Sequence, residues 1–487
     1  MRALRPVLIT ALALVACDGC YHLPLWKGDV KVTPLERKAV AKCGKGGPTA
    51  EGAKRLTREP YVMGTTTTST NVAWGSTDMR GQLVLTEPGG DVVQTIAASY
   101  VGDAGREEQR RSRQVTDPKN MPADDIYVIA AKIGNLQPTH LYCYQVVVDG
   151  VALTDPAPLG TAAAPALDEP TRFVALGDTG TGGPAQEAIG KRMTESPFEF
   201  MLLLGDIAYE SGTAAQLQGK FFAMYKEILR YVPIYPTLGN HERVTREGRP
   251  YLEAFVLPEP ERYYSFDWGD VHFVSIDTTQ RDSKQVLWLD DDLSRNKQPW
   301  TIVFGHHPMY TNSLRGPQMW IRQAFAKVVT DHKVDLVLTG HEHQYERFKI
   351  AGVNYVVSGG GGGQLTRFFG SSQALKQATV HHYLAFEVTK TKLVMKAIDI
   401  NGKEIETLTL EKKPSGEKKS SDPRQNPVPP EKTIKPDERL HDEPDDDINK
   451  RKVEPPITEP TPVPAQTTDA TPPRMKKGSS PNTTSPK

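Results

Sequence analysis

Five short motifs contain most of the residues whose types and spacing could do chemistry. Each supplies carboxylate, amide, phenol or imidazole groups, and each follows a short apolar run. The motifs read Gly177-Asp178-Thr179-Gly180, Gly205-Asp206-Ile207-Ala208-Tyr209, Gly239-Asn240-His241-Glu242, Gly305-His306-His307-Pro308 and Gly340-His341-Glu342-His343. Apolar runs of this length are typical of buried strands. Open α/β sheets place their sites in loops at the carboxyl ends of strands. The motifs therefore predict one metal site that holds two or more ions.

The order and wording of these motifs resemble the calcineurin-type metallophosphoesterases and, within them, the purple acid phosphatases. The resemblance covers roughly residues 58 to 411. One Gly-Asp or Gly-His pair is a weak signal because such pairs occur by chance, whereas five motifs in one order are specific. The resemblance implies hydrolysis of phosphate monoesters, with attack by a metal-bound hydroxide.

One departure from the wider superfamily concerns the first motif. Most metallophosphoesterases have Asp-x-His there, and the histidine binds the first metal; here that position is Gly180. Tyr209, three residues after Asp206, offers a replacement ligand. A phenolate favours Fe(III), a hard and highly charged ion, over Mg or Ca. The same exchange marks purple acid phosphatases, whose colour comes from a tyrosinate-to-iron transition. The alternative is that Tyr209 is an aromatic side chain that packs at a loop end.

Carried over position by position, the resemblance implies seven metal ligands. Those of the first metal would be Asp178, Tyr209 and His343, those of the second Asn240, His306 and His341, and Asp206 would bridge both. The expected cofactor is Fe(III) plus a divalent ion, either Fe, Zn or Mn. Carboxylates supply negative charge, imidazoles suit borderline ions, and an amide adds a neutral oxygen. With two ions about 3.5–4 Å apart, one orients the phosphoryl oxygen during an in-line attack.

The residues expected to act on the substrate are less sharply defined. Asp206, as the bridging ligand, and His241 are the expected catalytic residues, and His241 would stabilise the transition state or protonate the leaving oxygen. The alternative for His241 is a structural histidine with one core hydrogen bond. Successive side chains of a strand face opposite ways, and the family spacing selects His306 rather than His307. Arg315 could contact the substrate phosphate or be a solvated loop residue.

The amino terminus indicates export. Arg2 and Arg5 precede an apolar stretch, 7–16, that is too short to span a bilayer. It ends in Leu14-Val15-Ala16-Cys17, which resembles the lipobox of bacterial lipoproteins. Residues 1–16 are thus the expected signal peptide, and lipidation of Cys17 would tether an exported protein to a membrane of the cell envelope, inner or outer. An ordinary secretory signal with a nearby cysteine is the alternative.

The other cysteines are compatible with an oxidising compartment. Cys20, Cys43 and Cys143 remain if Cys17 is lipidated. One disulfide plus a free thiol would fit such a compartment. The pairs Cys43–Cys143 and Cys20–Cys43 are equally allowed, and three free thiols are a further alternative.

The order of patterns predicts a β plus α/β architecture with two domains and terminal extensions. Residues 61–148 contain Thr- and Val-rich stretches broken by Gly and Pro, and Tyr142, Tyr144 and Val146 alternate with period two, which indicates β structure with Trp74 as a core residue. Residues 58–165 resemble the fibronectin type III-like β-sandwich that precedes the catalytic domain in many purple acid phosphatases. Residues 170–411 are the expected metallophosphoesterase domain, an αββα sandwich. Residues 17–57 are expected to be a spacer. Residues 412–487 hold 16 of the 39 prolines and no aromatic residue, so a disordered tail is expected.

Several functions stay open at this level. The formal net charge is zero and nothing indicates nucleic acid as a partner. The first reading is a lipid-anchored, acid phosphatase-like hydrolase whose partner is a phosphate ester. Hydrolysis of phosphodiesters or nucleotides at the same site is an alternative within that class. A surface binding or adhesion protein without catalysis is the alternative from another class, although all seven ligand positions are filled.

Overall fold

The computed structural model describes residues 34–101, 128–165, 169–369 and 373–413. Several predictions concern residues outside these ranges. They are the signal peptide, the lipidation of Cys17, the pairing of Cys20 and all but two residues of the expected tail. Within the described ranges no helix combines the length and the apolar composition that crossing a membrane requires.

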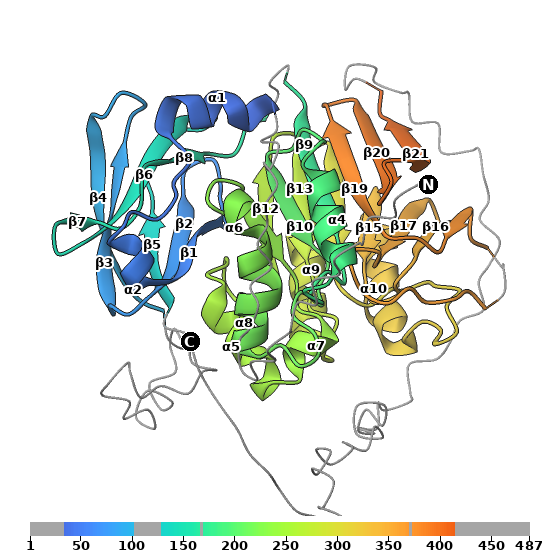
Figure 1. Cartoon of the computed structure of the whole chain (residues 1–487). Helices are drawn as coiled ribbons and strands as arrows, with labels where there is room; N and C mark the ends of the chain where they lie inside the picture. The colour runs from blue at the N-terminus through green and yellow to red at the C-terminus, as the bar shows by residue number, and fades with distance from the viewer. Residues whose placement is uncertain (1–33, 102–127, 166–168, 370–372, 414–487) are drawn as a thin grey trace, which may run out of the picture. The chain divides into compact units, whose positions relative to one another are not determined.

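The first part of the described chain consists of β-strands that follow two short helices (Figure 1). The elements are α1 (Pro34–Cys43), α2 (Gly52–Arg55), β1 (Leu56–Met63), β2 (Thr70–Ser76), β3 (Arg80–Thr86), β4 (Val92–Tyr100), β5 (Val128–Ile133), β6 (Leu141–Val148), β7 (Val151–Ala152) and β8 (Ala157–Gly160). These strands follow one another in the order β1-β2-β5-β4-β3-β6-β7, and β8 also pairs with β6. Strands β4 and β5 pair at Ser99 and Ala130 and at Tyr100 and Ile129. Residues 17–57, which were expected to be a spacer, therefore contain the helices α1 and α2. The Ala- and Pro-rich residues 154–165 before the second domain contain strand β8.

Period-two alternation builds the core of this part. Tyr142, Tyr144 and Val146 on β6 all face one apolar cluster, together with Trp74 of β2. Trp74 has no exposed surface, which agrees with its expected place in a core. A disulfide between Cys43 and Cys143 joins the end of α1 to β6, so of the pairings that the sequence allows the structure contains this one.

The second part has two sheets that meet face to face. Its first elements are β9 (Thr171–Leu176), α4 (Pro184–Met193), β10 (Phe200–Leu203), α5 (Ala214–Leu217), a π-helical turn (Gln218–Phe222), α6 (Ala223–Leu229), β11 (Ile234–Pro236), α7 (Asn240–Arg243), α8 (Arg249–Ala254), β12 (Tyr264–Trp268) and β13 (Val271–Ser275). The remaining ones are α9 (Ser283–Arg295), β14 (Trp300–Phe304), α10 (Met319–Asp331), β15 (Leu336–Thr339), β16 (Tyr345–Ile350), β17 (Val353–Ser358), β18 (Lys376–Ala378), β19 (His382–Val388), β20 (Lys392–Asp399) and β21 (Glu404–Glu411). One sheet runs β21-β20-β19-β9-β10-β11, and the other runs β12-β13-β14-β15-β17-β16-β18.

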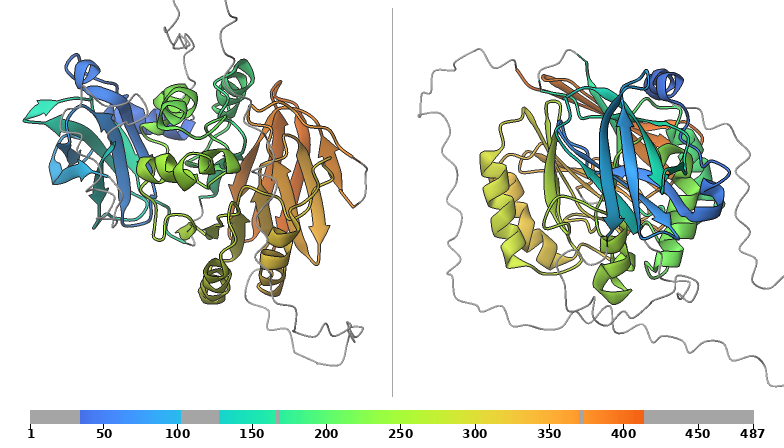
Figure 2. Two further views of the ribbon diagram at one scale, coloured as in Figure 1. Left: turned by 90° about the horizontal axis from the view of Figure 1, so that it is seen from below. Right: turned by 90° about the vertical axis from the view of Figure 1, so that its left-hand side faces the viewer.

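Alternating side chains of the second sheet separate two apolar layers. Ile302 and Phe304 of β14 belong to the large core that also holds the first sheet and the helices α4 and α6. Val303, between them, faces helices α9 and α10 instead. These two helices run side by side (Figure 2). The fold is therefore a mixed α/β arrangement in which helices cover the outer faces of two packed sheets, as metallophosphoesterase-type folds have.

The two parts share a sheet. Strand β1 pairs in parallel with β11 at Met63 and Ile234. The Arg58 guanidinium is buried there, donates a hydrogen bond to Gln218 Oε1 (2.7 Å) and lies over the Phe222 ring. Tyr144 donates to the backbone carbonyl of Arg230 (2.6 Å). These contacts fix the first part against the elements that lead into the third motif.

Candidate metal centre

The motifs meet because the strands that precede them are parallel neighbours. Strands β9, β10 and β11 pair in parallel in the first sheet, and β14 pairs in parallel with β15 in the second. Asp178, Asp206, Asn240, His306 and His341 each follow the carboxyl end of one of these strands. The two sheets therefore bring five predicted ligands to one edge.

Asp178, Tyr209 and His343 form the first cluster. The Tyr209 hydroxyl lies 3.0 Å from Asp178 Oδ1 and 2.9 Å from His343 Nε2. His343 Nε2 lies 3.3 Å from the same Asp178 oxygen. Ligand atoms that share an ion at about 2.0–2.2 Å lie about 3 Å from one another. The cluster thus has the separations that three ligands of one metal need.

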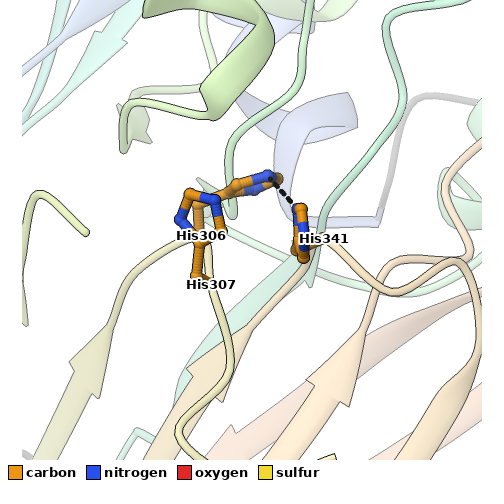
Figure 3. Close-up of side chains that lie close together, drawn as sticks. All are labelled: His306, His307 and His341. Carbon is orange, nitrogen blue, oxygen red and sulfur yellow. Dashed lines mark hydrogen bonds between the residues drawn. The ribbon is translucent and has the colours of Figure 1, made fainter. Parts of the chain in front are cut away.

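Asn240, His306 and His341 form the second cluster. Asn240 Oδ1 lies 3.0 Å from His306 Nε2 and 3.0 Å from His341 Nδ1. The two imidazole nitrogens lie 3.3 Å apart, and the rings, at the ends of β14 and β15, are nearly perpendicular, at 80° (Figure 3). The donor set of one amide oxygen and two imidazoles suits a divalent borderline ion.

Asp206 connects the two clusters. Its Oδ2 lies 3.2 Å from His306 Nε2, and its Oδ1 accepts a hydrogen bond from the His241 backbone amide (3.0 Å). Single ligand atoms of Asp178, Asp206 and His306 all lie within 4.8 Å of one another. One carboxylate therefore contacts the second cluster while it lies close to the first.

Backbone carbonyls select the nitrogen that two of the three predicted histidine ligands present. His306 Nδ1 lies 2.8 Å from the Leu204 carbonyl oxygen, and His343 Nδ1 lies 2.6 Å from the Gln364 carbonyl oxygen. Because a carbonyl only accepts, Nδ1 must carry the proton in both rings, which leaves Nε2 free to bind a metal. The same logic holds for many metal-ligating histidines in proteins.

The electrostatics of the cluster favour a positive charge at its centre. Burial raises the pKa of Tyr209 well above its usual value, and the carboxylates of Asp178 and Asp206 raise it further. Burial lowers the pKa of His306, but the Asp206 carboxylate outweighs burial and raises it. A phenolate at Tyr209 therefore needs a cation beside it, and Asp206 already stabilises positive charge. The residues present fit a multivalent metal.

Three of the predicted ligands have left-handed backbone conformations. The φ angles are +60° at Asp178, +51° at Asp206 and +70° at His341. Such conformations are costly for residues with a Cβ and cluster at functional sites. Their coincidence here indicates that the loops are shaped to aim these side chains.

The two predicted substrate-binding residues, His241 and Arg315, lie at the solvent-facing edge of the candidate metal centre. His241 Nδ1 contacts the Glu210 carbonyl oxygen (2.5 Å), and its Nε2 lies 3.9 Å from Asp206 Oδ2. The His241 side chain is 23% exposed, so it reaches both the cluster and solvent. Arg315 is exposed, and its positive charge helps to lower the pKa of His341 and opposes the rise in the pKa of Glu342 that burial causes. The structure therefore places Arg315 within electrostatic reach of the centre.

His307 lies next to the second cluster although the strand alternation turns it away from Asn240. Its Nδ1 lies 3.0 Å from Thr278 Oγ1. The centroid of its ring lies 4.4 Å from that of His341, and the two rings are tilted by 46°. Figure 3 shows His306 and His307 leaving the same strand end with His341 opposite. Single ligand atoms of His306, His307 and His341 all lie within 4.8 Å of one another, so the structure brings His307 close to the second cluster although the family spacing selects His306.

Glu242 is a functional residue that the motif comparison left without a role. Its buried carboxylate accepts hydrogen bonds from the backbone amides of Asp206 (2.9 Å), Ala208 (3.0 Å) and Gly239 (2.9 Å). It therefore fastens the second motif to the third. A glutamate at the third position of a short helix often bonds to the residue that starts the helix, and the spacing from Gly239 to Glu242 was the signal available.

The glycine-rich run 359–363, which follows β17 (Val353–Ser358), lies against the first and the fifth motif. Gly363 donates its amide to the Asp178 carbonyl (2.9 Å). A Cβ on Gly363 would lie 2.6 Å from the His343 ring, and one on Gly359 would lie 2.6 Å from Asp178 Oδ2. Only glycine permits this approach.

Residues 171–345 match the model of the calcineurin-like phosphoesterase family. This segment is a calcineurin-like phosphoesterase domain. Purple acid phosphatase 22 of Arabidopsis thaliana is 30% identical over 241 residues, which are 45% of this chain and 53% of that protein. A second Arabidopsis thaliana relative, named probable inactive purple acid phosphatase 9, is 30% identical over 189 residues, 30% of this chain and 29% of that protein.

The fold of the domain also agrees with solved structures of its relatives. Purple acid phosphatase PPD1 from yellow lupin (Lupinus luteus) seeds superposes with a TM-score of 0.61 at 19% identity, and the match covers 72% of this chain and 74% of that one. The chain spans about half the length of the curated relatives that it matches. The domain is therefore related to purple acid phosphatases in sequence and in fold.

Proposed function

We propose that this protein is a dinuclear metallohydrolase that cleaves phosphate monoesters. One observation carries the proposal: two groups of three metal-binding side chains, each with atoms about 3 Å apart, lie on either side of Asp206. The relationship of residues 171–345 to phosphoesterases supports the same reaction class.

The side chains divide the work by position. Asp178, Tyr209 and His343 would hold one ion, Asn240, His306 and His341 the other, and Asp206 both. When bound, two such ions polarise a phosphoryl oxygen and lower the pKa of water, so that a nucleophile is present at neutral pH. His241 presents Nε2 beside Asp206 because the Glu210 carbonyl holds its Nδ1 proton. From there it would donate a proton to the leaving oxygen.

We propose Fe(III) for the first position and a divalent ion, Fe, Zn or Mn, for the second. A phenolate and a carboxylate are hard anionic ligands that suit Fe(III). The high pKa of Tyr209 without a cation means that only a strongly charged ion would convert it to a phenolate. Two imidazoles and a neutral amide oxygen suit a divalent ion at the second position.

We also propose that the protein is exported and anchored by a lipid on Cys17. The disulfide between Cys43 and Cys143 supports export because disulfides persist in oxidising compartments. The antiparallel strands β2, β5, β4, β3 and β6, which pack around one apolar core, support a fibronectin type III-like fold for the first domain.

Two other functions remain candidates for specific reasons. The same ligand set would serve phosphodiesters or nucleotides, since the metals act on the phosphoryl group that all these esters share. A binding protein without activity is the second candidate, because one relative is named as probably inactive. The complete ligand set speaks for catalysis.

The test is to measure metal content and hydrolysis of p-nitrophenyl phosphate with the purified full-length protein. We expect about two metal ions per chain, and a loss of activity of at least about a hundredfold in Asp206→Asn because the shared carboxylate is lost. Asp399→Asn, a buried aspartate at the end of β20, is the control. Unchanged hydrolysis in Asp206→Asn would refute the mechanism. Two bound metals without hydrolysis of mono- or diesters would favour the binding protein.

A further inference from the structure

Exposed apolar side chains gather on two segments that extend from the metal centre. Ten large apolar residues of the described chain are exposed. Three of them lie on the segments 311–319 and 364–369: Leu314 (75% exposed), Met319 (53%) and Phe369 (72%). We call the side chains of Leu314 and Phe369 the apolar rim. Large exposed apolar groups close to a site often mark a binding surface.

Backbone contacts join these segments to each other. The amide of Phe369 donates to the carbonyl of Asn312 (2.7 Å), and Ser313 pairs with Phe368 in an antiparallel bridge. Leu314 and Phe369 therefore belong to two chain segments that run side by side.

The second segment is also bonded to a predicted metal ligand. His343 Nδ1 donates to the Gln364 carbonyl (2.6 Å), and the Thr366 amide donates to the His343 carbonyl (3.1 Å). Phe369 is five residues beyond Gln364, so at full extension it lies about 17 Å away from it at most. The apolar rim is thus within reach of a substrate group that extends from the metals.

Positive charge accompanies the apolar rim. Arg315, next to Leu314, is exposed. Arg367, two residues before Phe369, is exposed as well. Apolar side chains next to cations, beside a centre for phosphate esters, complement a molecule with an anionic head and an apolar chain.

We propose that the apolar rim binds the hydrocarbon chain of an amphiphilic phosphate monoester, with its phosphate at the metal centre and Arg315 beside the head. The inference rests on the proposed function and adds the substrate class. The seven ligands serve any phosphate ester, whereas the apolar rim distinguishes esters by the length of the chain that leaves.

The experiment measures kcat/KM of the full-length protein for n-alkyl phosphates from ethyl to decyl, at concentrations where the esters are monomeric. Burial of one methylene is worth about fourfold in binding, and half as much free energy at a surface leaves about twofold. We expect kcat/KM to rise by about twofold to fourfold for each methylene that reaches the apolar rim. Ethyl phosphate is too short to reach it and reports on the metal centre alone.

The double variant Leu314→Ser/Phe369→Ser should lose the rise with chain length and keep its kcat/KM for ethyl phosphate. Val92→Ser/Val93→Ser, with exposed side chains on β4, is the matched control and should keep the rise. A wild-type protein that hydrolyses all lengths equally would overturn the inference and leave the proposed function intact. So would a rise that persists in the double variant, or a wild-type dimer that the double variant abolishes.

Discussion

The backbone amide of Tyr209 donates a hydrogen bond to the carbonyl oxygen of Gly180, with a nitrogen–oxygen distance of 2.9 Å. This contact holds the second motif against the first. A Cβ at position 180 would lie 2.0 Å from the carbonyl carbon of Ile207, so no histidine fits there. The Tyr209 hydroxyl reaches Asp178 and His343 instead. The absence of a histidine at position 180 and the position of the Tyr209 hydroxyl are therefore two consequences of a single packing arrangement.

Replacement of Tyr209 by phenylalanine should remove the colour and spare the fold. If the first ion is Fe(III), the visible absorption arises from the phenolate, so Tyr209→Phe should abolish it. The phenyl ring keeps the apolar contacts of this buried side chain, and the melting temperature should change by only a few degrees. The checks are a visible spectrum and metal analysis of the wild type and the variant.

The control for this change is Tyr251→Phe, which removes a buried hydroxyl that bonds to the Pro236 carbonyl outside the centre. It should leave the spectrum unchanged. Colour that persists in Tyr209→Phe would show that another ligand binds the iron. Two metals without any visible band in the wild type would remove Fe(III) and point to Zn or Mn.

Glu242→Gln should weaken metal binding although Glu242 is not a predicted ligand. Its two oxygens accept three backbone amides, and a glutamine offers only one acceptor oxygen. An amide that loses its partner in a buried site costs about 1–3 kcal/mol, and loss of such supporting contacts typically lowers metal affinity by about 10- to 100-fold. Competition with a chelator, followed by metal analysis, measures the affinity.

Glu406→Gln separates a general loss of stability from this effect. Glu406 binds Tyr345 and Arg347 away from the centre, so its loss should lower the stability and leave metal affinity unchanged. Equal chelator resistance in the wild type and Glu242→Gln would show that the loops hold their shape without the carboxylate.

The amino-acid sequence predicted the convergence of the motifs better than it predicted the contacts that hold them in place. Residues such as Asp206 and His341 follow apolar strands in recognisable motifs, and parallel pairing brings the strand ends together, so their convergence followed from local patterns. Glu242 was missed because its role depends on three amides from two motifs that meet only in the folded chain. The helix α1 was missed because a polar segment that looks like a spacer is fixed by tertiary contacts and a disulfide. Long-range packing, rather than local preference, decides such cases.

The disulfide between Cys43 and Cys143 should stabilise the first domain. It closes a loop of 100 residues, and a cross-link of this span restricts the unfolded chain by roughly 4–5 kcal/mol in the entropy model, with about 2–5 kcal/mol typical of natural disulfides. Cys43→Ser/Cys143→Ser should lose that free energy of unfolding in urea and keep its metal content. Dithiothreitol should have the same effect on the wild type, and Cys20→Ser should have none. A wild type that is indifferent to reduction would contradict this expectation.

The stability of the second sheet should fall in alkaline solution because of His272. Burial lowers the pKa of this histidine, but hydrogen bonds to the carboxylates of Asp267 (2.7 Å) and Asp292 (2.8 Å) outweigh burial and raise it to about 9. The ordinary value is about 6.5. A folded-state pKa above the unfolded one stabilises the protein at low pH, so the contribution is complete below about 6.5 and disappears as the pH rises through about 9. The upper limit of this contribution is about 3 kcal/mol, at 1.36 kcal/mol for each pKa unit.

The measurement is the free energy of unfolding of the wild type minus that of His272→Gln, from urea titrations between pH 6 and 10. This difference should shrink by up to about 3 kcal/mol over that range. In Asp267→Asn/Asp292→Asn the same substitution should give a difference that barely changes with pH, because no carboxylate remains to hold the proton. A wild-type difference that is constant over this range would show that His272 is neutral in the folded protein.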